Sequence, residues 1–288
     1  MNYKGLQIAL RNYRDNGYKV NCKLNEKKEV LQKEFDRLQK LRNTKQNGYI
    51  LWRGISPIDG LTPVKVVATG FTIKSKNGKT GDMIQVWIML DNVHPKNAID
   101  SGDDYAICGN CPHRKNERGE RSCYVGIHTI GQIYKKDATD GYIDISNNIV
   151  ESLHLFQDKD VRFGSYGDPV CIPLHIVELI TKVCGHTGYT HQWRNPKFSA
   201  YKQYFHASVD TFSDYFDAKD SGWSTFRVRS QESTVMLNDE VYCQGGLKTT
   251  CKKCQLCSGT SSQQSHILID GHGSGSKYIT KERTQMTR

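Results

Sequence analysis

The chain has 288 residues, of which 37% are hydrophobic and 24% are charged, and its formal net charge is +10. This size and composition suit one large folded domain or two modest ones. No apolar run approaches the roughly 20 residues of a membrane-spanning helix, which excludes a protein anchored by such helices. The first residues lack the apolar stretch of a signal peptide, so we expect a cytoplasmic protein.

The positive charge is concentrated at the two ends of the chain. Residues 1–53 carry 13 Lys and Arg against 5 Asp and Glu, and residues 274–288 carry 4 against 1, so the stretch between them is nearly neutral. Basic ends favour attraction to a polyanion, and nucleic acid is the first candidate partner. Lysine-rich helices that are simply solvated give the same pattern, so both interpretations stay open.

The N-terminal residues 1–47 are predicted to form a basic helical extension. An amphipathic helix is expected over residues 26–43, where apolar side chains recur at intervals of three or four: Leu31, Phe35, Leu38 and Leu41. A shorter helix is expected over residues 5–16. The Asn-Gly pair at positions 47 and 48 breaks the helical pattern and marks a boundary.

After this boundary, β-rich runs alternate with helical stripes. The β-rich runs cover residues 64–69, 83–89, 161–164, 186–190, 204–209, 224–229 and 266–269, and the helical stripes cover 172–183 and 212–220. Alternation of this kind indicates βα units and a parallel sheet. We predict an α/β domain over residues 48–273, built as a partial or complete TIM-like βα barrel, and a disordered tail over 274–288. An open doubly wound sheet stays possible.

Ionisable residues follow several predicted strands. Asp168, His191 and Asp210 each stand where a β-rich run ends. The two carboxylates are a candidate pair for acid–base work or for a divalent metal, and His191 is a candidate general acid or base. Helix capping for the aspartates and an ordinary hydrogen-bonded role for the histidine are equally compatible with the pattern.

The loop over residues 74–82 is rich in lysine and glycine. It lacks the spacing of a phosphate-binding P-loop and no helical pattern follows it, so a plain exposed hairpin loop is expected.

Ten cysteines stand in the chain, and seven of them fall into two groups. The first group is C-x2-C-x11-C, formed by Cys108, Cys111 and Cys123, with His113 beside it. In a chain without a signal peptide, such spacing indicates metal binding more than disulfides. Three cysteines with His113 would complete a zinc site, whereas three cysteines alone suit an iron–sulfur cluster with one open iron.

The second group is denser. It consists of an outlying cysteine followed by a C-x2-C-x2-C run: Cys243, Cys251, Cys254 and Cys257. Four thiolates suit either an iron–sulfur cluster or zinc. The two groups could also meet at one site, which the spacing leaves open.

With these residues in view, the chain resembles an uncharacterised family of cysteine-cluster proteins from phage-type genomes. The likeness runs from about residue 50 to residue 273, and it includes segments 50–54, 164–169, 185–193 and 207–210 as well as both cysteine groups. This resemblance implies no known activity. A phage-encoded protein would act in the cytoplasm of the host.

The chain also resembles radical-SAM-like iron–sulfur barrel proteins. In that family, three cysteines after the first barrel strand hold a [4Fe–4S] cluster and leave one iron for S-adenosylmethionine. The resemblance implies cluster ligation by Cys108, Cys111 and Cys123, although the family spacing is C-x3-C-x2-C. It also implies that a turn after the second strand contacts S-adenosylmethionine, here through Gly164, Tyr166, Gly167 and Asp168.

For the second cysteine group, the resemblance implies an auxiliary cluster. We therefore predict an iron–sulfur protein, and favour a radical-SAM-like enzyme that acts on nucleic acid or a nucleotide. The alternative is a zinc-stabilised nucleic-acid-binding or nuclease-like phage protein without radical chemistry.

Overall fold

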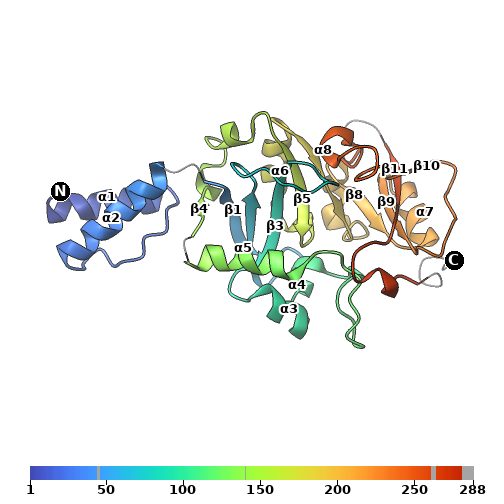
Figure 1. The fold of residues 1–288 in the computed structure, drawn as a ribbon, viewed down its shortest axis with the longest axis horizontal. Coiled ribbons are helices and arrows are strands. Elements are labelled where there is room, and N and C mark those ends of the chain that lie inside the picture. Colours follow the sequence, from blue (N-terminus) through green and yellow to red (C-terminus); the bar gives the residue numbers. More distant parts are fainter. Residues whose placement is uncertain (44–45, 140, 261–263, 281–288) are drawn as a thin grey trace.

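The computed structural model describes residues 1–43, 46–139, 141–260 and 264–280. The chain begins with two helices, α1 (Tyr3–Asp15) and α2 (Lys28–Asn43), and continues into a mixed α/β body with two β-sheets (Figure 1). The predicted helices over 5–16 and 26–43 are confirmed as α1 and α2.

The first sheet has the strand order β4-β1-β2-β3-β5-β6. Its strands are β1 (Gly48–Ile55), β2 (Pro63–Thr69), β3 (Ile84–Leu90), β4 (Ile143–Asp144), β5 (Asp160–Tyr166) and β6 (Gly185–Thr187). β1, β2 and β3 pair antiparallel, whereas β3, β5 and β6 pair parallel. The expectation of a purely parallel sheet is therefore wrong for the first three strands. Short loops without a helix join them, and such connections produce antiparallel neighbours.

The second sheet is parallel throughout and has the order β10-β11-β9-β8-β7. Its strands are β7 (Tyr189–Thr190), β8 (His206–Val209), β9 (Thr225–Arg229), β10 (Glu240–Tyr242) and β11 (His266–Asp270). Each sheet keeps its edge strands, so no closed barrel forms and the expected complete TIM-like barrel is not confirmed.

Gly188 is the one residue between β6 of the first sheet and β7 of the second. Its N–H donates to the carbonyl of Cys257 at 2.9 Å, and its carbonyl accepts from the N–H of His206 at 3.0 Å. A Cβ at this position would lie 2.7 Å from the ring of Phe205. A glycine is therefore needed where one extended segment passes from the first sheet to the second.

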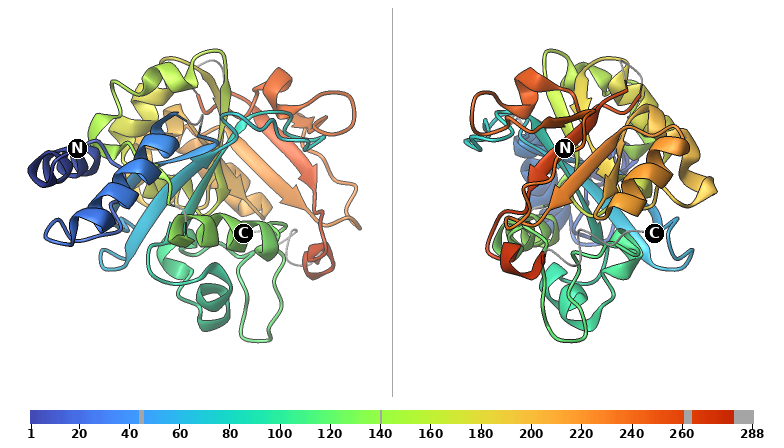
Figure 2. Two further views of the ribbon diagram at one scale, coloured as in Figure 1. Left: turned by 60° about the vertical axis from the view of Figure 1, so that its left-hand side comes forward. Right: turned by 90° about the vertical axis from the view of Figure 1, so that its right-hand side faces the viewer.

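The helices of the body lie on the outer sides of the sheets (Figures 1 and 2). They are α3 (Pro95–Ser101), α4 (Tyr105–Cys108), α5 (Ile127–Thr139), α6 (Leu174–Thr181), α7 (Phe212–Asp220) and α8 (Cys251–Cys254). The 3-10 helices are η1 (Ser146–Asn148), η2 (Leu153–Phe156), η3 (Pro169–Cys171), η4 (Pro196–Gln203) and η5 (Ser276–Tyr278). Across the described residues, none of the helices is long and apolar enough to span a membrane.

The α1–α2 hairpin has a small apolar core of its own. Four leucines are fully buried there: Leu6, Leu10, Leu31 and Leu38. The hairpin meets the body where the N–H of Asp144 donates to the carbonyl of Gly17 at 2.8 Å. Figure 1 shows the two helices at one end of the molecule, beyond β1 and β4.

The predicted disordered tail over 274–288 differs from the structure in its first part. Residues 276–278 form η5, and Ile279 is buried against Gly271. An apolar side chain anchors this segment, which a composition rich in Gly, Ser and Lys does not indicate. Residues 281–288 lie outside the described residues.

Candidate metal centres

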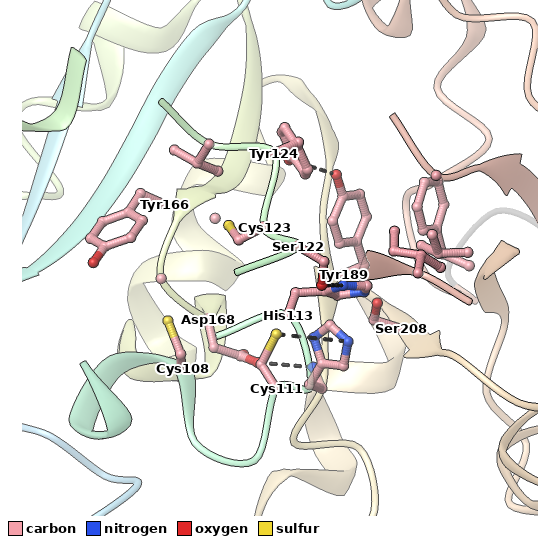
Figure 3. A pocket seen from close by; sticks show the side chains of 18 of the residues that line it. Cys108, Cys111, His113, Ser122, Cys123, Tyr124, Tyr166, Asp168, Tyr189 and Ser208 are labelled. Carbon is pink, nitrogen blue, oxygen red and sulfur yellow. Dashed lines mark hydrogen bonds between the residues drawn. The ribbon is translucent and has the colours of Figure 1, made fainter. Parts of the chain in front are cut away.

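The first cysteine group lines a cavity at the C-terminal ends of the strands. Cys108, Cys111 and Cys123 face this cavity, as Figure 3 shows. Asp168 follows β5, His191 follows β7 and Asp210 follows β8. Asp168 and His191 line the cavity, and Asp210 contacts the ring of His191 beside it.

Two local turns bring the first cysteines together. Cys108 ends α4, and the N–H of Cys111 donates to the Cys108 carbonyl at 3.2 Å. The N–H of Asp168 donates to the carbonyl of Ile107 at 2.6 Å, which ties the cysteine-bearing helix to the end of β5. The C-x2-C turn is therefore held beside the C-terminal end of β5.

The long spacer before Cys123 is a closed loop. The N–H of Cys123 donates to the carbonyl of His113 at 3.0 Å, so the intervening residues leave the cavity and return to it. Within the loop, the Asn116 side chain accepts from two backbone N–H groups, those of Arg118 and Glu120. The loop between Cys111 and Cys123 thus brings the third cysteine to the same cavity as the first two.

His113 has partners on both ring nitrogens. Its Nδ1 lies 2.8 Å from the hydroxyl of Ser122, and its Nε2 lies 2.8 Å from Oδ1 of Asp210. The other oxygen of Asp210 lies 3.2 Å from Nε2 of His191. The carboxylate of Asp210 therefore bridges two imidazoles, and His113 is directed toward Asp210.

His191 also approaches the cysteines. Its Nε2 lies 4.0 Å from Sγ of Cys111. Burial disfavours the imidazolium, but the Cys111 thiol and the Asp210 carboxylate outweigh burial and raise the pKa of His191 well above its ordinary value. Burial likewise opposes ionisation of Asp210, yet His113 and His191 hold its pKa far below the ordinary value. These groups favour a charged His191–Asp210 pair beside the thiols.

The ligand atoms of His113, His191 and Asp210 lie within 4.8 Å of one another. Two imidazoles and a carboxylate form a donor set that zinc and iron accept. This group was only partly predicted, because the sequence analysis considered His113 as a partner of the cysteines. His113 stands two residues after Cys111, and this short spacing suggests a role beside the cysteines. Nothing in it indicates that His113 contacts Asp210, which lies almost one hundred residues later in the chain.

Asp168 is held mainly by backbone donors. Its Oδ2 accepts from the N–H of His191 at 2.9 Å, and its Oδ1 accepts from the N–H of Val170 at 3.2 Å. Burial raises the pKa of Asp168, while hydrogen bonds from Thr190 and these backbone groups oppose the rise. His191 thus connects the two aspartates. Asp168 accepts from its backbone N–H, and Asp210 contacts its ring.

The predicted cofactor-binding turn lines the same cavity. Gly164, Tyr166, Gly167 and Asp168 all contribute to its wall. Gly167 has φ +75°, and a Cβ there would lie 2.8 Å from Ile88, so a side chain would force β3 and β5 apart. The Tyr166 hydroxyl is buried and has no hydrogen-bond partner among the described residues. A buried hydroxyl without a partner costs about 1–3 kcal/mol, which a bound polar group would offset.

The three thiols fit a metal group by their donor chemistry. Burial raises the pKa of Cys108 well above its ordinary value, and the neighbouring Cys111 thiol raises it further. Burial also raises the pKa of Cys123, although Arg121 opposes the rise. The raised pKa values disfavour the thiolate forms of Cys108 and Cys123, which a bound cation would stabilise. Which metal would occupy this cavity stays a prediction.

The second cysteine group lines a separate cavity. Cys243, Cys251, Cys254 and Cys257 all contribute to it. The N–H of Cys243 donates to the Leu268 carbonyl at 2.8 Å, which fixes this cysteine beside β11. Gln255, with φ +50°, turns the chain after α8 so that Cys257 reaches the same cavity. Burial raises the pKa of Cys257 well above its ordinary value, and the thiols of Cys243 and Cys251 add to the rise.

The two cysteine groups lie at opposite ends of β5. Asp168 at its C-terminal end lines the first cavity, whereas Asp160 at its N-terminal end accepts from Gln255 of the second group at 2.5 Å. Figure 1 shows α4 and α8 on opposite sides of the body. The two cavities share no lining residue. The possibility that both groups form one site is therefore wrong.

His186 is not part of either cysteine cavity. Its Nε2 lies 3.0 Å from the carbonyl of Tyr204, and burial lowers its pKa. This is an ordinary hydrogen-bonded histidine. Two other wall residues of the first cavity, Tyr124 and Ile279, were not predicted from the sequence.

Comparison with known proteins gives no match: no family model matches the chain, nor does any curated protein or solved structure. The two family resemblances stay predictions.

Proposed function

We propose that the chain is an iron–sulfur protein of radical-SAM-like type, with its catalytic cluster held by Cys108, Cys111 and Cys123. The observation that carries the proposal is that three thiols line one cavity while the neighbouring His113 has both ring nitrogens engaged elsewhere. A three-thiol set without a fourth protein ligand suits a cluster with one open iron. A zinc site would instead use a fourth ligand.

The strand arrangement supports the same proposal. β3, β5 and β6 are parallel neighbours, and β7, β8, β9 and β11 continue the parallel series beyond Gly188. We interpret this series as an open, partial βα barrel. Its C-terminal strand ends carry the first cavity, which is where barrel enzymes hold their active sites.

Each residue of the cavity has a defined task in this proposal. When bound, a [4Fe–4S] cluster supplies the electron that cleaves S-adenosylmethionine reductively. The turn from Gly164 to Asp168 would form the wall that contacts the cofactor, and its glycines are needed for the turn itself, since a Cβ on Gly164 would lie 3.0 Å from Pro169 and one on Gly167 would lie 2.8 Å from Ile88. His191 lies close enough to Cys111 to donate toward its sulfur, and Asp210 stabilises the charged form of His191.

The test begins with anaerobic purification and measurement of iron, sulfide and zinc. The expected result is a brown protein with iron matched by sulfide, which releases 5′-deoxyadenosine from S-adenosylmethionine after reduction. Cys108→Ala should abolish this cleavage. Cys184→Ala, a change outside both groups, is the matched control and should retain it. A colourless protein that holds only zinc would overturn the radical proposal.

Nucleic-acid binding by the α1–α2 hairpin is a second candidate function. The hairpin has its own core and exposes many basic side chains: Lys4, Arg11, Arg14, Lys19, Lys23, Lys27, Lys28, Lys33 and Lys40. Phosphate contacts from such a surface give affinity without reading sequence. This role is compatible with a nucleic-acid substrate for the first cavity and with the zinc-stabilised alternative. Removal of residues 1–47 should abolish binding to both DNA and RNA at low salt.

A further inference from the structure

His113, His191 and Asp210 form a group that the proposed function does not use as a whole. One ligand atom of each lies within 4.8 Å of the other two. Among the described residues, no other set of three His, Cys, Asp or Glu side chains is gathered so tightly. A single metal ion needs ligand atoms this close, whereas the thiolates of an iron–sulfur cluster bind different irons. The group therefore suits one ion.

The distances within the group match those between ligands of one ion. Nε2 of His113 lies 2.8 Å from Oδ1 of Asp210, and Nε2 of His191 lies 3.2 Å from Oδ2 of the same carboxylate. Nitrogen and oxygen atoms that are each bound about 2.1 Å from one ion lie about 3 Å apart. Both imidazoles therefore present Nε2 at the place where an ion bound to the carboxylate would lie.

Contacts outside the group hold the two histidines in place. The hydroxyl of Ser122 lies 2.8 Å from Nδ1 of His113, so the ring can donate there and keep the lone pair of Nε2 for an ion. The carboxyl of Asp168 accepts from the backbone N–H of His191 at 2.9 Å. Hydrogen bonds of this kind orient the histidine ligands of metal sites and fix their tautomer.

Two cavities reach the group from different sides. His113 and His191 line the first cavity. His191 and Asp210 also line a polar pocket of about 290 Å³, to which Asn110 and Arg194 contribute. The three ligand side chains are only 10%, 12% and 17% exposed, so an ion among them would be largely shielded from solvent. The polar pocket gives such an ion a path of entry.

We propose that His113, His191 and Asp210 bind one divalent metal ion of the manganese, iron and zinc class, with an open coordination position toward the polar pocket. Two histidines and one carboxylate with open positions are the ligand set of mononuclear iron and zinc enzymes. The ion takes the place of the proton that Nε2 of His191 otherwise holds toward Asp210. The inference goes beyond the proposed function, because it requires neither a cluster nor S-adenosylmethionine.

The test uses Mn²⁺, because this ion prefers oxygen and nitrogen ligands to thiolates and so distinguishes the group from the cysteines. The full-length chain is freed of metal with a chelator and titrated with Mn²⁺ under anaerobic conditions, and free Mn²⁺ is measured by electron paramagnetic resonance. The expected result is one bound Mn²⁺ per chain. Bound Mn²⁺ should also accelerate the relaxation of water protons, since the open position holds exchangeable water.

Substitutions then test the ligands. Asp210→Asn, which keeps the size of the side chain, and His113→Gln should each weaken Mn²⁺ binding more than about 100-fold, the upper end of the loss expected from an outer contact alone. Ser122→Ala, which removes such an outer contact, should weaken binding about 10- to 100-fold. His186→Gln changes a buried histidine that lines neither the first cavity nor the polar pocket. It is the matched control and should bind as the wild type does.

Two results would overturn the inference. One is the absence of Mn²⁺ binding at millimolar concentration. The other is equal affinity in Asp210→Asn and His186→Gln, because the three side chains would then form only a hydrogen-bonded network. Circular dichroism checks that each variant is folded. If Asp210→Asn does not fold, His113→Gln and Ser122→Ala decide in the same way.

Cys108→Ser separates this result from the proposed function. It should prevent formation of the cluster and leave Mn²⁺ binding unchanged. Loss of Mn²⁺ binding in Cys108→Ser as large as that in Asp210→Asn would place the ion among the thiols and contradict the inference. A wild-type chain that binds one Mn²⁺ but forms no iron–sulfur cluster would contradict the radical proposal and support the metal site.

Discussion

The side chain of Asp168 accepts a 2.9 Å hydrogen bond from the backbone N–H of His191, and this contact joins the C-terminal ends of β5 and β7. Because the same histidine reaches Cys111 and Asp210 through its ring, Asp168 indirectly sets the position of the ring that faces the thiols. Asp168 therefore lines the first cavity and also acts as a clamp, by which we mean that it holds the end of β7 against the end of β5.

Replacing Asp168 tests the clamp. Asp168→Asn keeps the size of the side chain but removes one acceptor oxygen, so a buried N–H loses its partner. The free energy of unfolding should fall by about 1–3 kcal/mol, measured by urea denaturation. Asp220→Asn, at an exposed position at the end of α7, should change it by less than about 0.5 kcal/mol. Equal effects of the two changes would contradict the clamp.

The two cysteine cavities should load metal independently. Cys111→Ser should remove the metal of the first group and leave the second group filled, whereas Cys254→Ser should do the opposite. The physical reason is that the cavities share no wall residue and lie at opposite ends of β5. Metal per protein in each single variant is the measurement, with Cys22→Ser as control. Loss of all metal from either variant would indicate one coupled centre.

His206 should make the fold sensitive to acid. It is fully buried in β8, where it contacts the Gly259 N–H and the Ser265 hydroxyl, and burial lowers its pKa to about 3. The unfolded chain binds this proton near pH 6.5, so the contribution of His206 to stability is constant above that pH and is lost as the pH falls from about 6.5 to about 3. The slope is about 1.4 kcal/mol per pH unit at most.

Unfolding measured at pH 7.5 and pH 5 checks this prediction. His206→Gln removes the titrating group, so its loss of stability between the two pH values should be smaller than that of the wild-type chain. His128→Gln, at an exposed position of α5, should keep the wild-type pH dependence. A His206→Gln profile parallel to the wild type would show that other groups control the acid response.

Nucleic-acid binding by the hairpin should depend on its exposed lysines. The triple change of Lys27, Lys28 and Lys33 to Gln should weaken binding to duplex DNA and RNA. It should also reduce the slope of log affinity against log salt by about one per lost phosphate contact. The control changes three exposed lysines of the body to Gln: Lys76, Lys96 and Lys182. If both triples behave alike, the attraction comes from net charge and not from the hairpin.

Local patterns predicted much of the secondary structure. The expected helix over 212–220 coincides with α7, where Thr211 and Asp214 form a capping box that lies close together in sequence. The β-rich run over 83–89 corresponds to β3, whose side chains are buried on both faces. Both features depend on residues a few positions apart, so periodicity and propensity reveal them.

The presence of short strands and the direction of strand pairing were harder to predict from the sequence. β1 and β4 were missed, because β4 has only two residues and β1 combines buried and exposed positions without clear alternation. The antiparallel start of the first sheet follows from short connections, which a count of βα units does not include. The open edges of both sheets likewise depend on packing between distant segments.

The sequence by itself determined the local motifs: the C-x2-C turns, the glycine-rich turn before Asp168, and the basic helices, all set by neighbours along the chain. Only the tertiary structure decided how they combine. It separated the cysteines into two cavities and directed His113 toward Asp210. These relations join residues tens to hundreds of positions apart, and they depend on the packing of whole strands, which no local pattern contains.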